Sequence, residues 1–206
     1  ETNTVTINGN NDAPVISGGP DAEDLTETNS GLSTLGSLTV SDVDTSDVVT
    51  ATRTLAVSGT SNRSDPAAPS DATLLSMFNV SASTVLSGTQ TSATLNWTFD
   101  SGSQAFDYLA AGQTLVLTYT VTATDDNGTA LSDSETVTLT ITGSNDAPVI
   151  SLLSQDADSA ALTEINAALT AEGSLSVSDV DRANTVSPSV VQVVATGATT
   201  GLQSNN

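Results

Sequence analysis

Residues 114–124 run Thr-Leu-Val-Leu-Thr-Tyr-Thr-Val-Thr-Ala-Thr, and this stretch decides the fold class. Its odd-numbered positions carry apolar side chains, whereas threonine fills every even-numbered position except that of Val116. A period of two residues is that of a β-strand with one face buried and the other in solvent. Residues 135–142 repeat the pattern with Val137, Leu139 and Ile141. Such alternation in successive strands favours a two-layer antiparallel β-sandwich.

Further short segments have strand-like composition and are separated by turn-forming residues, which is typical of a sandwich. Short helical turns are expected over 72–78 and 104–110. The one tryptophan, two tyrosines and three phenylalanines all fall between Phe78 and Tyr119. We expect these rings to pack in a core rather than to form a sugar-stacking platform. The remaining predicted strands are 13–17, 34–41, 48–58, 81–87 and 93–99.

The chain contains an internal repeat. Asn-Asp-Ala-Pro-Val-Ile at residues 11–16 returns at residues 145–150, and ETNTVTING ahead of the first copy matches ETVTLTITG ahead of the second. Behind each copy follows Leu-Thr-Glu, and then GSLTVSDVD at residues 36–44 and GSLSVSDVD at residues 173–181. Accidental agreement over four ordered blocks is implausible, so the sequence predicts tandem modules.

The positions of these blocks predict three parts. Residues 1–10 are the last strand of a preceding repeat, residues 11–144 form one complete repeat, and residues 145–206 are the N-terminal part of the next. We expect the chain to be a piece of a longer array. The incomplete repeat contains counterparts of the early strands at 147–151 and 174–178, and a third candidate at 186–195. We expect it to be ordered only when its missing strands come from elsewhere.

The composition excludes several classes of function. Asp and Glu number 24 against three arginines, and the formal net charge is −21, with no histidine and no cysteine. A Ser-His or Cys-His nucleophile, a His/Cys zinc site and a disulfide framework therefore cannot be built. A polyanion of this density is repelled by nucleic acid and by anionic lipid. No apolar run reaches the length of a membrane span, so we expect neither nucleic-acid binding nor membrane insertion.

An enzyme is also not expected. Two carboxylates suffice in principle for a glycosidase, but its general acid needs an apolar pocket that raises its pKa. The acids of this chain gather instead in polar turns and near the repeat boundaries.

These gathered acids favour a bound cation. Asp42 and Asp44 lie two residues apart, which places both carboxylates on one side of an extended chain. Several carboxylates without a basic partner are costly unless a cation separates them. Ca²⁺ accepts six to eight oxygens in irregular geometry and suits loop carboxylates better than Mg²⁺ does. The alternative is that Asp and Asn occupy turns only for local hydrogen bonding, but the Asn-Asp and Asp-Val-Asp elements recur together in both copies.

Three motifs together resemble a known family. The Asn-Asp-Ala-Pro-Val junction, the Ser-Asp-Val-Asp element and the run from Phe106 to Gly128, FDYLAAGQTL…TDDNG, are similar to the VCBS repeat. That repeat is a cadherin-like module found in tandem in very large bacterial surface adhesins. The resemblance covers essentially the whole chain. It implies tandem cadherin-like (Ig-like, Greek-key) β-sandwich repeats, the second one incomplete here, with Ca²⁺ at the junctions.

The resemblance also implies a ligand set. Asn11 and Asp12 match the cadherin linker, Asp42 and Asp44 match the Asp-x-Asp loop, and Asp125 closes a strand at the same end of the sandwich. Cadherins place an acidic motif where Leu109–Gly112 stands here, so Asp107 is the nearest substitute. The remaining ligands, expected together at the opposite end, are Glu27, Asn145, Asp146, Asp179 and Asp181.

The function expected from these features is that of a Ca²⁺-stiffened structural extender of a giant bacterial adhesin, outside the cell, in adhesion and biofilm. Its partners would be neighbouring repeats of the same chain. Two alternatives stay open. The chain could be a filament subunit that assembles with other copies through strand exchange, or a module that binds a glycan or protein ligand.

Overall fold

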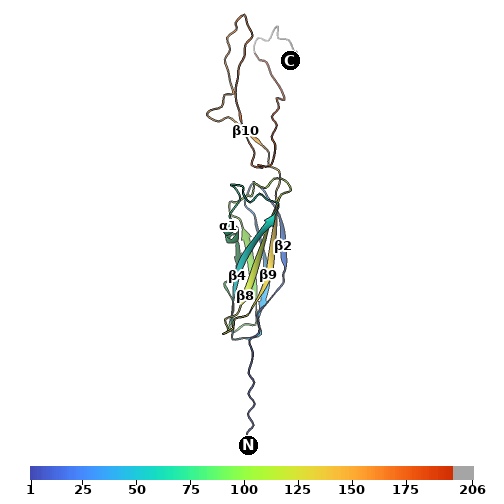
Figure 1. The fold of residues 1–206 in the computed structure, drawn as a ribbon, viewed down its shortest axis with the longest axis vertical. Helices are drawn as coiled ribbons and strands as arrows, with labels where there is room; N and C mark the ends of the chain where they lie inside the picture. Colours follow the sequence, from blue (N-terminus) through green and yellow to red (C-terminus); the bar gives the residue numbers. More distant parts are fainter. Residues whose placement is uncertain (197–206) are drawn as a thin grey trace. The chain divides into compact units, whose positions relative to one another are not determined.

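The computed structural model describes residues 1–196, and the chain forms two compact units. The first contains Glu1–Ala147 and Val180–Arg182, and the second contains Pro148–Asp179 and the described residues 183–196. Figure 1 shows the strands of the first unit as a layered set of arrows. Within residues 1–196, no helix combines the length and apolar character needed to cross a bilayer.

The first unit is a sandwich of two sheets, which confirms the predicted all-β fold. One sheet has the strand order β1-β3-β7-β5, and the other has the order β2-β9-β8-β4-β6. The first sheet consists of β1 (Val15–Ser17), β3 (Ser33–Ser41), β7 (Ser92–Asp100) and β5 (Phe78–Val80). The second consists of β2 (Asp21–Thr26), β9 (Ser132–Thr142), β8 (Thr114–Thr124), β4 (Val48–Gly59) and β6 (Thr84–Ser87).

The strand that decides the fold class lies at the centre of the second sheet. β8 pairs antiparallel with β9 and with β4, and Leu117 lies opposite both Leu139 and Val57. The odd-numbered residues of β8 from Leu115 to Ala123 are buried, as the alternation predicts. All six aromatic residues are buried as well, and the Phe78 ring stacks on Tyr119 at a centroid distance of 4.2 Å. The expectation of core aromatics is therefore confirmed.

The strand β2 was not predicted, because its sequence Asp-Ala-Glu-Asp-Leu-Thr shows little apolar alternation. After β1 the chain turns at Gly18, whose φ of +90° suits glycine, and crosses to the other sheet. There β2 pairs with β9 in parallel, with Leu25 opposite Ile141. This pairing corrects the prediction of a wholly antiparallel sandwich. An edge position tolerates the polar composition because one face of β2 remains in solvent.

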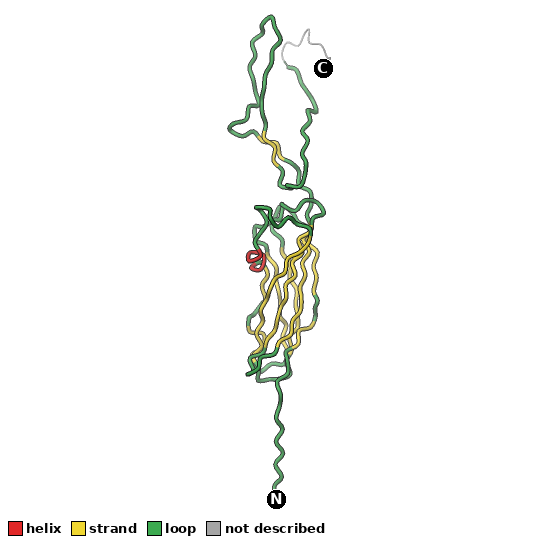
Figure 2. Tube along the Cα trace, viewed as in Figure 1, coloured by secondary structure: helices red, strands yellow, loops and turns green. Residues whose placement is uncertain are grey.

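The two predicted helical turns have different outcomes. The segment 72–78 contains the helix α1 (Asp71–Ser76), which begins after the N-cap Ser70, while Phe78 already belongs to β5. Figure 2 shows this short helix against the strands. The segment 104–110 contains turns and no helix, because Phe106 has a φ of +69° that breaks the helical path. The predicted strand 81–87 is shorter than expected and begins at Thr84.

The second unit has few strands. β10 (Val149–Ser151) pairs antiparallel with β11 (Ser176–Ser178), so the two early strands predicted for this repeat form. The third candidate, 186–195, contains no strand. Among the described residues, the sheet of the second unit consists of β10 and β11 alone. Apolar side chains stay in solvent, among them Ile150 at 62% and Val191 at 95% exposure. Residues 197–206, the end of the predicted incomplete repeat, lie outside the described residues.

The N-terminal segment forms no strand either. Residues 1–14 contain no regular structure, and Val5 and Ile7 are 84% and 90% exposed. These residues therefore alternate apolar and polar side chains as a strand does, but they belong to no sheet.

Candidate metal centres

The first acidic cluster consists of Asp42, Asp47 and Asp125. Each offers a carboxylate oxygen within 4.8 Å of the others, and their exposed fractions are 3%, 4% and 4%. No basic side chain forms an ion pair with any of them among the described residues. Three buried carboxylates this close repel one another strongly unless a cation lies between them.

Turns at one end of the sandwich position this cluster. Asp42 follows β3, Asp47 precedes β4 and Asp125 follows β8. The loop between β3 and β4 is folded by its own acids, because Asp42 Oδ1 accepts from the N–H of Asp44 at 2.9 Å and the N–H of Asp47 donates to the Asp44 carbonyl at 3.0 Å. After β8, Asp125 Oδ1 accepts from the N–H of Leu131 at 3.1 Å. These local bonds fix the orientation of the Asp42 and Asp125 carboxylates within their turns.

The predicted junction residues reach this cluster. Asn11 Nδ2 donates to Asp125 Oδ2 at 3.0 Å, and the main-chain N–H of Asp12 donates to Asp44 Oδ2 at 2.7 Å. The side chain of Asn11 therefore lies at the cluster, whereas Asp12 is exposed and joins it through its backbone. Buried oxygens without a hydrogen-bond partner remain on Asn11 (Oδ1), Asp42 (Oδ2) and Asp47 (Oδ2).

Sequence reasoning did not include Asp47 among the ligands. A signal was present, because Asp42, Asp44 and Asp47 lie within one short loop between two strands. A carboxylate three residues after Asp44 lies back beside Asp42 only when the loop turns as it does here, so the Asp-x-Asp pattern alone does not identify it.

Burial and neighbouring charges perturb this cluster. Burial is the main cause that raises the pKa of Asp42 above its ordinary value. The negative charges of Asp47, Asp44 and Asp125 raise the pKa further, and the hydrogen bond from the Asp44 N–H opposes the change. An ion at this point would reduce the repulsion, so these three carboxylates could hold a cation.

The second cluster lies in the first unit and consists of Glu27, Asp107 and Asp146, again with carboxylate oxygens within 4.8 Å of one another. Glu27 is 1% exposed and follows β2, while Asp107 comes from the turn segment after β7. Glu27 Oε2 accepts from both the N–H and the hydroxyl of Ser144 at 2.8 Å. Its other oxygen, Oε1, is buried and has no hydrogen-bond partner. The same is true of Oδ1 of Asp107.

The second copy of the Asp-Val-Asp motif joins this cluster through Asp181. Its Oδ2 accepts from the main-chain N–H of Asp146 at 2.8 Å, and the residue is fully buried. Burial, followed by the negative charges of Asp146 and Asp181, raises the pKa of Asp107. The resemblance implied that Asp107 replaces a missing acid, and the structure places it among these carboxylates.

Two predicted ligands are placed differently. Asn145 is exposed, and its Nδ2 donates to the carbonyl of Asp146 at 2.8 Å. Asp179 belongs to the second unit and is half-buried, directly after β11. The oxygens gathered in the two clusters belong to carboxylates, joined in the first cluster by the side-chain amide of Asn11. This donor set fits a hard cation such as Ca²⁺ and lacks the nitrogen and sulfur ligands of transition metals.

Comparisons with known proteins identify no family. No family model matches the chain, and no curated protein matches it. Similar solved structures include a PapD-like domain of human CEP192, with 12% identity, a TM-score of 0.41, and coverage of 69% of this chain and 94% of that chain. The CooA pilin subunit from enterotoxigenic Escherichia coli has 11% identity, a TM-score of 0.39, and coverage of 64% and 99%.

A third similar structure contains cadherin-like domains 1 to 4 of zebrafish RET. The identity is 15%, the TM-score is 0.28, and the match covers 64% of this chain and 27% of that chain. At these values the likenesses bear on neither the function nor the partners of this chain.

Proposed function

We propose that the chain is a Ca²⁺-stiffened structural extender from a tandem array of VCBS-type repeats in a bacterial surface adhesin. The observation that carries the proposal is the composition of the two acidic clusters. Each combines acids from the complete sandwich with a residue of an Asn-Asp-Ala-Pro junction, Asn11 in one cluster and Asp146 in the other. A cation bound there would fasten the junction to the sandwich.

The electrostatics supports this role. The formal net charge is −21, and the buried Asp42, Asp47 and Glu27 each have a carboxylate oxygen without a hydrogen-bond partner. Buried carboxylates that lack a compensating positive charge cost several kcal/mol as an order of magnitude. A divalent cation offsets that cost and binds the folded protein, so it stabilises the fold by mass action. The junction then loses the freedom that a flexible linker would have.

The role is mechanical and requires no catalysis. Repeats joined stiffly would hold a distal binding domain away from the cell surface, and the partners are the neighbouring repeats. Strands of about eleven residues make each sandwich roughly 35 Å long, so each repeat would extend the array by about that length. The assignment to VCBS repeats, to adhesion and biofilm, and to an extracellular location rests on the sequence motifs.

A second candidate function is assembly into a filament through strand exchange. It is favoured by one observation. Residues 1–9 match 135–143, which contain most of β9, yet Val5 and Ile7 are exposed and form no strand. A strand of this kind could be added to the sheet of another copy. Glycan binding lacks comparable support, because all six aromatic residues are buried.

Thermal unfolding of the chain in Ca²⁺ and in chelator tests the proposal. We expect Ca²⁺ to raise the melting temperature and calorimetric titration to detect bound ions. The variant Asp125→Asn should reduce both effects, and the matched control Asp100→Asn, at an exposed acid that caps Gly102, should reduce neither. An unchanged melting temperature in Ca²⁺ would contradict the proposal.

A further inference from the structure

The loop 59–70 between β4 and α1 has a defined internal structure. Asp65 Oδ1 accepts from the N–H of Ala67 at 2.8 Å, and the Asp65 N–H donates to the carbonyl of Asn62 at 3.1 Å. The N–H of Ala68 in turn donates to the carbonyl of Asp65 at 3.0 Å. These bonds hold the carboxylate of Asp65 in one orientation, with 5% of its side chain exposed.

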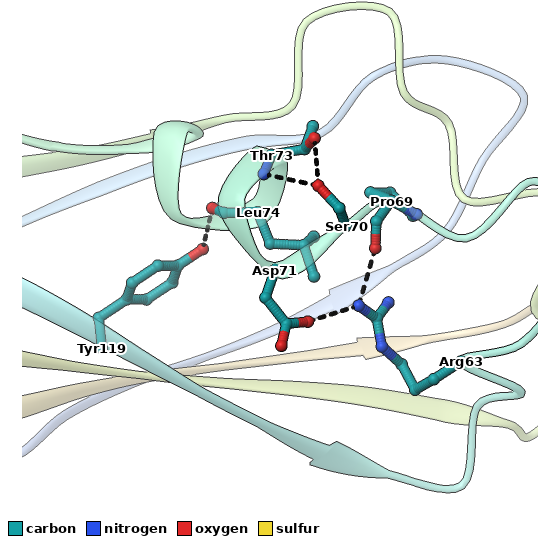
Figure 3. Close-up of polar contacts among 7 residues, drawn as sticks. All are labelled: Arg63, Pro69, Ser70, Asp71, Thr73, Leu74 and Tyr119. Atoms are coloured by element: carbon teal, nitrogen blue, oxygen red, sulfur yellow. Dashed lines mark hydrogen bonds and ion pairs between the residues drawn. The ribbon is translucent and has the colours of Figure 1, made fainter.

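A second set of contacts fastens this loop to the sandwich. Arg63 Nη2 donates to the carbonyl of Pro69 and to Asp71 Oδ1, both at 2.7 Å. Figure 3 draws these two contacts as dashed lines. The side chain of Ser70 caps α1 by accepting from the N–H of Thr73 at 3.2 Å. On the other side of that helix, the hydroxyl of Tyr119 donates to the carbonyl of Leu74 at 2.8 Å. The loop is thus a rigid support and not a slack connection.

One residue from far along the chain contacts this support. Arg182 Nε lies 3.5 Å from Asp65 Oδ2. Arg182 directly follows Asp181, which binds the N–H of Asp146, and the segment Val180–Arg182 belongs to the first unit. In the other copy of the motif, the residue after Asp44 is Thr45, which carries no charge. The contact therefore distinguishes the two junctions.

We propose that the Asp65–Arg182 ion pair, formed on the loop 59–70, holds Asp181 in place without a metal ion. The first copy of the motif has Thr45 at the position of Arg182, so it has no arginine to form this ion pair.

The positive charge of Arg182 matters because the chain is strongly acidic. The chain has three cationic side chains against 24 acids, and Arg182 directly follows the buried Asp181. Its guanidinium compensates the buried carboxylate of Asp65. The pair is partly open, since the Arg182 side chain is 60% exposed. The expected effect is therefore modest, as for other ion pairs near the surface.

Amide hydrogen exchange of the 206-residue chain in chelator tests this proposal. The Asp146 N–H reports whether Asp181 is in place. We expect Arg182→Thr, which introduces the residue of the other copy, to speed its exchange about threefold to tenfold. Asp65→Asn should act similarly, because it removes the charge and keeps an acceptor for the Ala67 N–H. In the double variant the two effects should not add.

The controls separate the contact from general charge effects. Arg182→Lys should retain most of the protection, and Glu164→Gln, which removes an exposed negative charge elsewhere, should leave the Asp146 exchange rate unchanged. Equal exchange rates in the wild-type chain and Arg182→Thr would overturn the proposal, as would fully additive effects. Because the measurement is made in chelator, its outcome does not depend on whether Ca²⁺ binds the clusters.

Discussion

The main-chain N–H of Asp146 donates to Oδ2 of Asp181 at 2.8 Å across 35 residues of sequence. The first copy contains the same bond, from the N–H of Asp12 to Oδ2 of Asp44 at 2.7 Å. In both copies the second acid of Asp-Val-Asp thus holds the junction backbone. One oxygen of Asp44 therefore restrains the backbone at Asp12, and one oxygen of Asp181 restrains the backbone at Asp146.

These two bonds predict that substitution of either aspartate accelerates amide exchange at its own junction only. Asp181→Ala removes the acceptor of the Asp146 N–H and should destabilise that junction by about 1–2 kcal/mol. Exchange of the Asp146 amide should accelerate, whereas exchange of the Asp12 amide should not. Asp44→Ala should do the reverse. If each variant accelerated both amides equally, the two bonds would not be separate local restraints.

The second prediction concerns Asp47, the acid that the sequence motifs did not identify. Asp47→Asn removes one of three buried charges and should weaken Ca²⁺ binding at the first cluster about tenfold or more. The matched control is Asp126→Asn, an exposed acid beside the same cluster whose Oδ1 accepts from the N–H of Val48. Calorimetric titration of both variants checks the difference. Equal affinities would show that Asp47 is not a ligand.

The third prediction concerns pH in the absence of metal. The pKa of Asp42 is raised in the folded protein, so the native state binds more protons than the unfolded chain between its raised pKa and its ordinary value. The free energy of unfolding should therefore rise as the pH falls through that interval. Urea denaturation in chelator at several pH values measures this slope.

The variant Asp42→Asn provides the control for that slope. It cannot take up the proton, so the stability of the metal-free protein should depend less on pH in this interval. A slope identical to that of the wild-type chain would mean that other acids cause the effect.

The fourth prediction concerns the core at Gly36. A Cβ at this position would lie 2.5 Å from a ring carbon of Trp97 and 2.6 Å from Asp21 Oδ2, which accepts from the Trp97 indole N–H. Gly36→Ala should destabilise the sandwich by about 1–3 kcal/mol. At Gly128 a Cβ would meet nothing within 4 Å, so Gly128→Ala should change stability little. Urea denaturation compares the two, and equal midpoints would contradict the packing described here.

Much of the fold follows from local patterns. The alternation in β8 and β9 predicted which residues are buried, and the aromatic residues were correctly assigned to the core. These predictions succeed because a strand places successive side chains on opposite faces, whatever its neighbours are. β2 was missed because an edge strand needs little apolar alternation, and the segment 104–110 was misassigned because a single positive φ at Phe106 ends its helical path.

The sequence by itself determined the repeat, the alternating strands and the identity of most of the clustered acids, because these depend on residue type and short spacing. Only the tertiary structure decided that Asp47 lies beside Asp42 and Asp125, that Asp107 lies beside Glu27 and Asp146, and that Arg182 lies beside Asp65. The contact of Asp47 with Asp42 depends on how one loop turns, and the other contacts join residues that several strands and turns separate along the chain. A small change in any one turn moves a carboxylate by more than the length of a hydrogen bond, so spacing along the chain cannot specify them.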